Sequence, residues 1–169
     1  MIANSKADQL ISSGFDNLIK IWRLFPYAQE ALAPLMTLYC VHTPLHMCMM
    51  RSKLAVAFQD HASATYSVVM YNIRNRNRLD HGAKDDHKDS VTGIAACPKM
   101  RILASCSQDG TIRIWNQDNS LVRIIQLNAV PHSVTFCSAK GDMLVSVGDH
   151  VHRIDYKNYM PQAYRFVHV

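Results

Sequence analysis

The chain has 169 residues, of which 49% are hydrophobic and 18% charged, and its formal net charge is +5. This is the length of one ordinary domain with enough apolar residues for a core, and no run approaches the roughly 18 apolar residues of a membrane span. The start, MIANSKADQ, lacks the apolar run of a signal peptide, and the five cysteines include no CxxC pair. Composition therefore favours a cytoplasmic protein with reduced thiols over a membrane protein or a disulfide scaffold.

The first predicted strand pair lies in Leu10 to Trp22, which reads LISSGFDNLIKIW. Its two apolar, β-rich runs are joined by Asp16-Asn17, residues that tolerate the positive φ of a tight turn. Few residues precede Leu10, too few for a further strand with a normal connection. We therefore expect a first unit over residues 8–40 that lacks its own first strand.

The second unit, residues 41–82, is weaker in pattern. Its predicted strands are Thr43 to Met49, Lys53 to Gln59 and Ser67 to Tyr71. The connection from Asp60 to Tyr66 is longer than a tight hairpin turn, which predicts a small loop insertion.

The third unit, residues 83–128, has the clearest pattern. Asp109-Gly110 is a strong hairpin signal, and the residues after it, TIRIW, favour a half-buried strand. The predicted strands are Ser90 to Cys97, Ile102 to Ser107, Thr111 to Trp115 and Leu121 to Leu127.

The fourth unit, residues 129–169, has a degenerate hairpin around Gly148-Asp149. We expect strands from Ser133 to Cys137, Met143 to Val147 and His150 to Asp155, with Tyr164 to Val169 as a candidate fourth strand.

Trp22 and Trp115 lie two periods of about 46 residues apart, which indicates a repeat. The repeated hairpins resemble blades of the WD40 family. That resemblance implies an all-β WD40 β-propeller of about three and a half four-stranded blades, part of a larger ring. A closed ring takes about four to eight blades, so further sequence or another chain would complete it. A small four-bladed ring is the alternative.

The resemblance also implies a structural network of polar side chains in each blade. His87, Ser105, Asp109 and Trp115 match its four places in the third blade, and Ser12, Asp16 and Trp22 match three in the first. A buried Trp N–H and a buried His ring both need hydrogen-bond partners. In the second blade Val56 and Tyr71 stand in the Ser and Trp places. The fourth blade is expected to keep Ser146, with Asp155 near the Trp place.

Two clusters of side chains could instead form a metal site or a catalytic site. Cys40, His42, His46 and Cys48 are all suitable zinc ligands, but four ligands along one straight strand would span about 27 Å. They would need a turn at Thr43-Pro44, and the alternative is that Cys48 packs in the core while the histidines lie near the rim. The run 85–89 surrounds His87 with carboxylates, which could serve acid–base catalysis, yet it also fits a loop between blades. We therefore expect no catalytic, cofactor or metal site.

These features favour a non-enzymatic scaffold that binds other proteins. Three longer stretches, LAVAFQDHASATYSVVMYN, DDHKDSVTGIAACP and LVRIIQLNAVPHSVTFC, are similar to the propeller of a large WD40 protein linked to cilia. This similarity implies a place in a ciliary or flagellar axonemal assembly. A substrate-receptor or adaptor propeller of a ubiquitin ligase or signalling complex is the alternative. Nucleic acid is not the favoured partner, because no stacking aromatics interleave with Arg74, Arg76 and Arg78.

Overall fold

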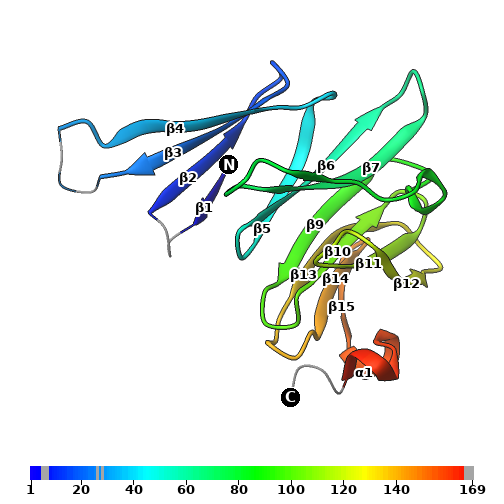
Figure 1. Ribbon diagram of the computed structural model, residues 1–169. Helices are drawn as coiled ribbons and strands as arrows, with labels where there is room; N and C mark the ends of the chain where they lie inside the picture. Colours follow the sequence, from blue (N-terminus) through cyan, green and yellow to red (C-terminus); the bar gives the residue numbers. More distant parts are fainter. Residues whose placement is uncertain (5–7, 26, 28, 166–169) are drawn as a thin grey trace.

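The computed structural model describes residues 1–4, 8–25, 27 and 29–165, and they form four antiparallel sheets (Figure 1). In each sheet the strands pair in chain order, so each sheet is built from one local stretch of sequence. The first strands of successive sheets lie next to one another. The sheets are thus consecutive blades of an incomplete propeller, which confirms the predicted fold class.

The strands of the four blades are as follows. Blade 1 contains β1 (Ile2–Asn4), β2 (Gln9–Ser13), β3 (Leu18–Leu24) and β4 (Leu32–Tyr39). Blade 2 contains β5 (Pro44–Met50), β6 (Lys53–Asp60), β7 (Thr65–Asn72) and β8 (Arg78–Leu79). Blade 3 follows a 3-10 helix (Ala83–Asp85) and contains β9 (Val91–Cys97), β10 (Ile102–Ser107), β11 (Thr111–Asn116) and β12 (Leu121–Gln126). Blade 4 contains β13 (Pro131–Phe136), β14 (Met143–Val147) and β15 (His150–Ile154), followed by α1 (Tyr156–Tyr159) and α2 (Gln162–Arg165).

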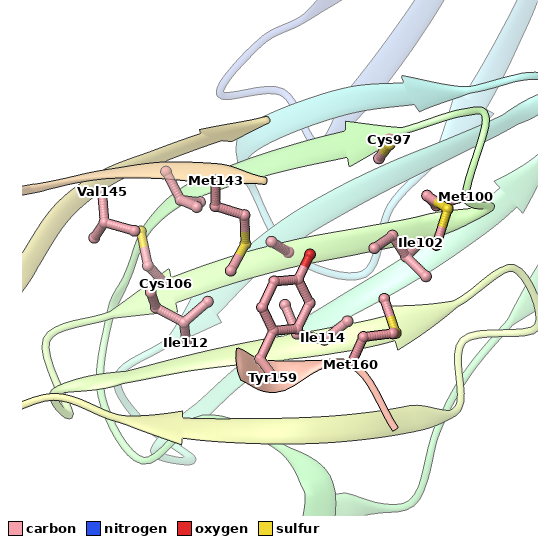
Figure 2. Packing of buried hydrophobic residues seen from close by; sticks show 12 residues of the cluster. Cys97, Met100, Ile102, Cys106, Ile112, Ile114, Met143, Val145, Tyr159 and Met160 are labelled. Atoms are coloured by element: carbon pink, nitrogen blue, oxygen red, sulfur yellow. The ribbon is translucent and has the colours of Figure 1, made fainter. Parts of the chain in front are cut away.

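The core lies between blades, because each inner blade buries both faces against its neighbours. Alternate residues of β10 and β11 therefore pack in opposite directions: Ile102 and Ile114 face blade 4, whereas Leu103 and Trp115 face blade 2. The layer between blades 3 and 4 is extended by residues that follow the last strand. Figure 2 shows Tyr159 of α1 and the adjacent Met160 beside that layer.

Three predictions about the blades are wrong. Blade 1 does not lack its first strand, because the short β1 pairs with β2 from Ile2↔Ile11 to Asn4↔Gln9. Blade 2 has no loop insertion, because β6 and β7 stay paired as far as Asp60↔Thr65 and leave only residues 61–64 for the turn. In blade 4, Tyr164 lies in α2 instead of a fourth strand, and residues 166–169 of that predicted strand lie outside the described residues.

The turns lie at two opposite ends of the propeller. At one end, called here the hairpin end, are the turns between the second and third strands of each blade and the connections from blade to blade. At the other end, called here the opposite end, are the turns that join the first to the second strand and the third to the fourth. In the described part of the chain, no helix is long and apolar enough to cross a membrane.

Candidate functional site

The four expected network residues of blade 3 come together at the hairpin end. Trp115 Nε1 donates to Ser105 Oγ over 2.9 Å, and Ser105 Oγ lies 2.7 Å from His87 Nε2. His87 Nδ1 lies 3.1 Å from Asp109 Oδ2. One assignment of protons satisfies the whole row: the Ser105 hydroxyl donates to Nε2, and the Nδ1–H of a neutral His87 donates to the carboxylate.

Burial and hydrogen bonding together set the charge states within this network. The side chain of His87 is fully buried, and burial lowers the pKa of His87, an effect that the neighbouring Asp109 carboxylate only partly opposes. Burial alone would raise the pKa of Asp109. Hydrogen bonds from His87, from Thr111 and from the Lys88 N–H nevertheless hold the pKa of Asp109 far below its usual value. The network therefore contains a neutral imidazole and a carboxylate that stays ionised.

The network fastens the start of blade 3 to its central hairpin. Asp109 Oδ1 accepts the Thr111 N–H over 2.9 Å, which closes the hairpin turn, while Asp109 Oδ2 accepts the Lys88 N–H over 2.9 Å. Arg113 Nη2 lies 3.7 Å from Asp109 Oδ2, and Arg113 Nη1 donates to the backbone oxygen of Asp85. The connection before β9 is thus held to β10 and β11 by side chains that approach it from the sheet.

The Ser–His–Asp connectivity is also that of a hydrolase triad, but here the serine cannot attack a substrate. Ser105 is 0% exposed, and its oxygen already accepts the Trp115 N–H. A nucleophile needs an approach path for a carbonyl carbon and a site for the oxyanion. The geometry favours a role in holding the blade together.

Blade 1 contains part of the same arrangement. Trp22 Nε1 donates to Ser12 Oγ over 2.9 Å, the length found in blade 3, but both side chains are only half-buried. Asp16 accepts the Leu18 N–H over 3.2 Å in the hairpin turn. The structure therefore brings Ser12 and Trp22 together, whereas Asp16 acts locally in its turn.

Strand register shows what replaces the network in blade 2. Tyr71 pairs with Leu54 as Trp115 pairs with Leu103, so Tyr71 and Val56 occupy the Trp and Ser places as expected. The hydroxyl of Tyr71 donates to Cys40 Sγ over 3.7 Å. Burial raises the pKa of the Cys40 thiol, which keeps it protonated. An apolar valine and a weak sulfur contact thus replace the buried polar row.

Blade 4 has lost the network, and the predicted place of Ser146 is wrong. Met143 pairs with Ile154, and both Met143 and Val145 pack against blade 3. In blade 3 the corresponding residues are Leu103, which packs against blade 2, and Ser105, which accepts the N–H of Trp115 from the same layer. Val145 therefore occupies the Ser place, and Ser146 points to the other face. Ile154 stands where blade 3 has tryptophan, one residue before the expected Asp155.

The structure does not gather the four candidate metal ligands of residues 40–48 into one site. Cys40 contacts Tyr71, the ring of His42 stacks on Phe58 at 5.2 Å, and Cys48 packs against the layer between blades 2 and 3. Burial raises the pKa of the Cys48 thiol to about 12, so it stays protonated at neutral pH. Among the described residues, no three His, Cys, Asp or Glu side chains are close enough to hold a metal ion.

Sequence reasoning missed two side chains that support the network. The ring centroids of His81 and Trp115 lie 4.2 Å apart, and His81 Nε2 lies 3.0 Å from Asp86 Oδ1. A second histidine, from the end of blade 2, thus packs against the tryptophan of blade 3. Asn119, fully buried in the turn after β11, donates to the backbone oxygens of Val68 and Leu79. Asp118-Asn119 is a residue pair typical of turns, but the contact of Asn119 with blade 2 depends on how the blades pack.

Comparison with known proteins agrees with this architecture. Residues 82–116, which contain the complete network, match the family described as WD domain, G-beta repeat. In fold, the chain is similar to the WD40 beta propeller domain of Doa1, with a TM-score of 0.66 and 20% identity over 97% of this chain and 50% of that chain.

Three curated relatives extend the similarity. The chain is 37% identical over 157 residues to WD repeat-containing protein 97 of Homo sapiens, which covers 93% of this chain and 10% of that protein. It is 27% identical over 139 residues to Target of rapamycin complex subunit LST8 of Saccharomyces cerevisiae, a match that covers 80% of this chain and 42% of that protein. It is 37% identical over 51 residues to Cilia- and flagella-associated protein 57 A of Tetrahymena thermophila, a match that covers 30% of this chain and 4% of that protein. The chain thus spans less than half the length of each of these relatives.

Proposed function

Because the chain belongs to the WD40-repeat family of β-propellers, we propose that it is a non-enzymatic scaffold that binds other proteins in a large assembly. WD40 propellers are in general protein-interaction scaffolds. One observation carries the proposal: the polar residues with catalytic connectivity, His87, Ser105 and Asp109, are enclosed within a blade. Recognition then belongs to the exposed turns at the two ends.

The setting that we propose is the axoneme of cilia or flagella. One relative supports it by name: Cilia- and flagella-associated protein 57 A, which is similar along 30% of this chain. The resemblance of three longer stretches to a large WD40 protein linked to cilia favours the same setting. The excess of basic residues would favour encounter with an acidic microtubule surface by long-range attraction. We further propose that additional blades, from further sequence or another chain, complete the ring.

The proposal can be tested in ciliated cells with the full-length protein carrying a tag. We expect the tag along the axoneme and axonemal proteins among the proteins that co-purify with it. A tagged protein that is diffuse or nuclear, and absent from purified axonemes, would contradict the ciliary setting. A protein that co-purifies with nothing would contradict the scaffold function itself.

A second candidate is an adaptor propeller in a ubiquitin ligase or signalling complex. The similarity to a subunit of the Target of rapamycin complex along 80% of this chain favours it. In that case the same purification would recover kinase or ligase subunits from cells with and without cilia, and removal of cilia would leave the complex intact.

A further inference from the structure

The ionisable residues of blades 2 and 3 are divided between the two ends of the propeller. Aspartates lie in or directly beside the hairpin-end turns of all four blades and in the connection from blade 2 to blade 3, where the basic residues are Lys84 and Lys88. The aspartates at this end are Asp16, Asp60, Asp80, Asp85, Asp86, Asp89, Asp109 and Asp149. The hairpin end is therefore acidic although the chain as a whole is basic.

The opposite end of blades 2 and 3 carries positive charge. Its turns, and the first residue of β6, contain Arg51, Lys53, Arg74, Arg76, Lys99 and Arg101. The acidic residue among these turns is Asp118. Figure 1 shows the turns from β5 to β6 and from β9 to β10 on the same side of the molecule. Two neighbouring blades thus combine their basic residues at one end.

A cavity of about 200 Å³ lies within this basic region, at the junction of blades 2 and 3. Its lining residues are Met50, Arg51, Ser52, Lys53, Arg101 and Gln117. Lys53 Nζ donates to the Gln117 backbone oxygen and lies 3.4 Å from Asp118 Oδ1, which fixes one wall. Arg51 Nε donates to the Pro98 backbone oxygen over 3.2 Å. In the described part of the chain, no carboxylate forms an ion pair with Arg51 or Arg101, so their charges remain available.

The turns tolerate arginine at positions that suit other residues better. Arg51, Arg76 and Arg101 have φ values of 59°, 62° and 54°. A side chain in this left-handed region costs on the order of 1 kcal/mol, and glycine or asparagine adopts it at lower cost. Three turns therefore place a charged side chain where glycine or asparagine would strain the backbone less.

We propose that this basic end binds an acidic segment of a partner protein, with one or more Asp or Glu carboxylates entering the cavity between Arg51 and Arg101. The inference rests on the proposed scaffold function and names its docking surface and partner class. Guanidinium groups suit carboxylates because they donate two parallel hydrogen bonds. A volume of about 200 Å³ is large enough to admit a carboxylate side chain. No aromatic side chain lines it among the described residues, so base stacking, a feature of single-stranded nucleic-acid sites, has no platform there.

The test compares binding of a fluorescent polyglutamate peptide to the full-length protein and to two variants. In the double variant Arg51→Asn with Arg101→Asn, both charges are lost while asparagine retains the left-handed turns. The matched control, Lys84→Gln with Lys88→Gln, removes the same charge from the hairpin end. We expect the double variant to bind about five- to tenfold more weakly and the control to remain within about twofold of the parent protein. Raising the salt concentration should weaken parent binding.

Several outcomes would overturn the proposal. These are no binding of polyglutamate, equal binding by both variants, or tighter binding of a single-stranded oligonucleotide or a phosphatidylserine vesicle through the same arginines. Concentration-dependent self-association that the arginine changes abolish would assign the surface to a second copy and also overturn it. If cellular partners co-purify equally with the double variant, the scaffold function stands and this surface is wrong. If nothing co-purifies with the parent protein, the scaffold function fails.

Discussion

At the scale of single residues, two serines make the same hydrogen bond in different surroundings. Ser105 and Ser12 each accept a tryptophan N–H over 2.9 Å. Ser105 and Trp115 are fully buried, whereas Ser12 and Trp22 are half-buried. The energetic value of the bond depends on whether water can replace the lost partner, and only blade 1 gives water that access.

Replacing Ser105 with alanine should therefore destabilise the protein more than replacing Ser12. Ser105→Ala leaves the Trp115 N–H and His87 Nε2 without their partner in a dry site, and we expect a loss of about 1–3 kcal/mol in the free energy of unfolding. Ser12→Ala removes an equivalent bond that water can replace, so its loss should stay below about 1 kcal/mol. Urea unfolding followed by tryptophan fluorescence measures both. Equal losses would show that burial does not set the value of this bond.

The neutral state of His87 should make stability depend on pH. Burial lowers the pKa of His87 in the folded chain, whereas the unfolded chain has the ordinary value of about 6.5. As the pH falls below about 6.5, the unfolded chain binds a proton that the folded chain does not, so stability declines until the folded pKa is reached. The lowered pKa of Asp109 adds a further loss below about pH 4.

Thermal unfolding between pH 5 and pH 7.5 tests this dependence. We expect the melting temperature to fall toward pH 5, and His87→Gln to flatten the slope because the titrating group is gone. The exposed His150 provides the control, since His150→Gln leaves the network intact and should retain the slope. An unchanged slope in His87→Gln would contradict the neutral assignment.

At the scale of secondary structure elements, the turn after β11 joins two blades. Asn119 has a φ of 61°, and its side-chain amide donates to Val68 and Leu79 in blade 2 over 2.9 and 3.0 Å. A buried turn residue thus satisfies backbone oxygens of the neighbouring sheet, which anchors blade 3 to blade 2.

Asn119→Gly separates the two tasks of this residue. Glycine retains the left-handed backbone but removes both hydrogen bonds between blades, and we expect a loss of about 1–3 kcal/mol in the free energy of unfolding. The control is Ala64→Gly, at an exposed turn residue with a φ of 50°. Relief of its backbone strain should leave stability unchanged or slightly raised. Chemical denaturation of both variants measures the difference. A loss of stability in Asn119→Gly alone would show that Asn119 stabilises the fold through its hydrogen bonds to blade 2, and no loss would show that only its left-handed backbone is needed.

The elements also show where sequence reasoning succeeds and where it ends. Asp109-Gly110 and the strand after it are local signals, so the central hairpin of blade 3 could be predicted from its own residues. The short β1 has almost no alternation of apolar and polar residues, and it forms because its backbone pairs with the edge of β2. The loss of serine in blade 4 follows from which residue faces blade 3, which is a matter of register that a degenerate hairpin does not reveal.

At the scale of the whole molecule, the first and last blades lack a neighbour on one side within the described structure. Blade 1 leaves apolar side chains such as Leu35 exposed, and β15 of blade 4 exposes Val151 at 68% while no strand pairs with its outer edge among the described residues. Sheet faces and edges of this kind associate with other sheets. This exposure is consistent with the proposal that further blades complete the ring.

The 169-residue chain by itself should therefore self-associate through its end blades. A lysine on the exposed face of β15, Val151→Lys, should oppose this association, because a charge buried against another sheet is costly. Phe15→Lys is the matched control: Phe15 is 93% exposed but lies in a turn at the hairpin end. Size-exclusion chromatography with light scattering should show a larger monomer fraction for Val151→Lys than for Phe15→Lys. If both changes raise that fraction equally, general charge causes the effect, and the end blade is not the surface through which the chain associates.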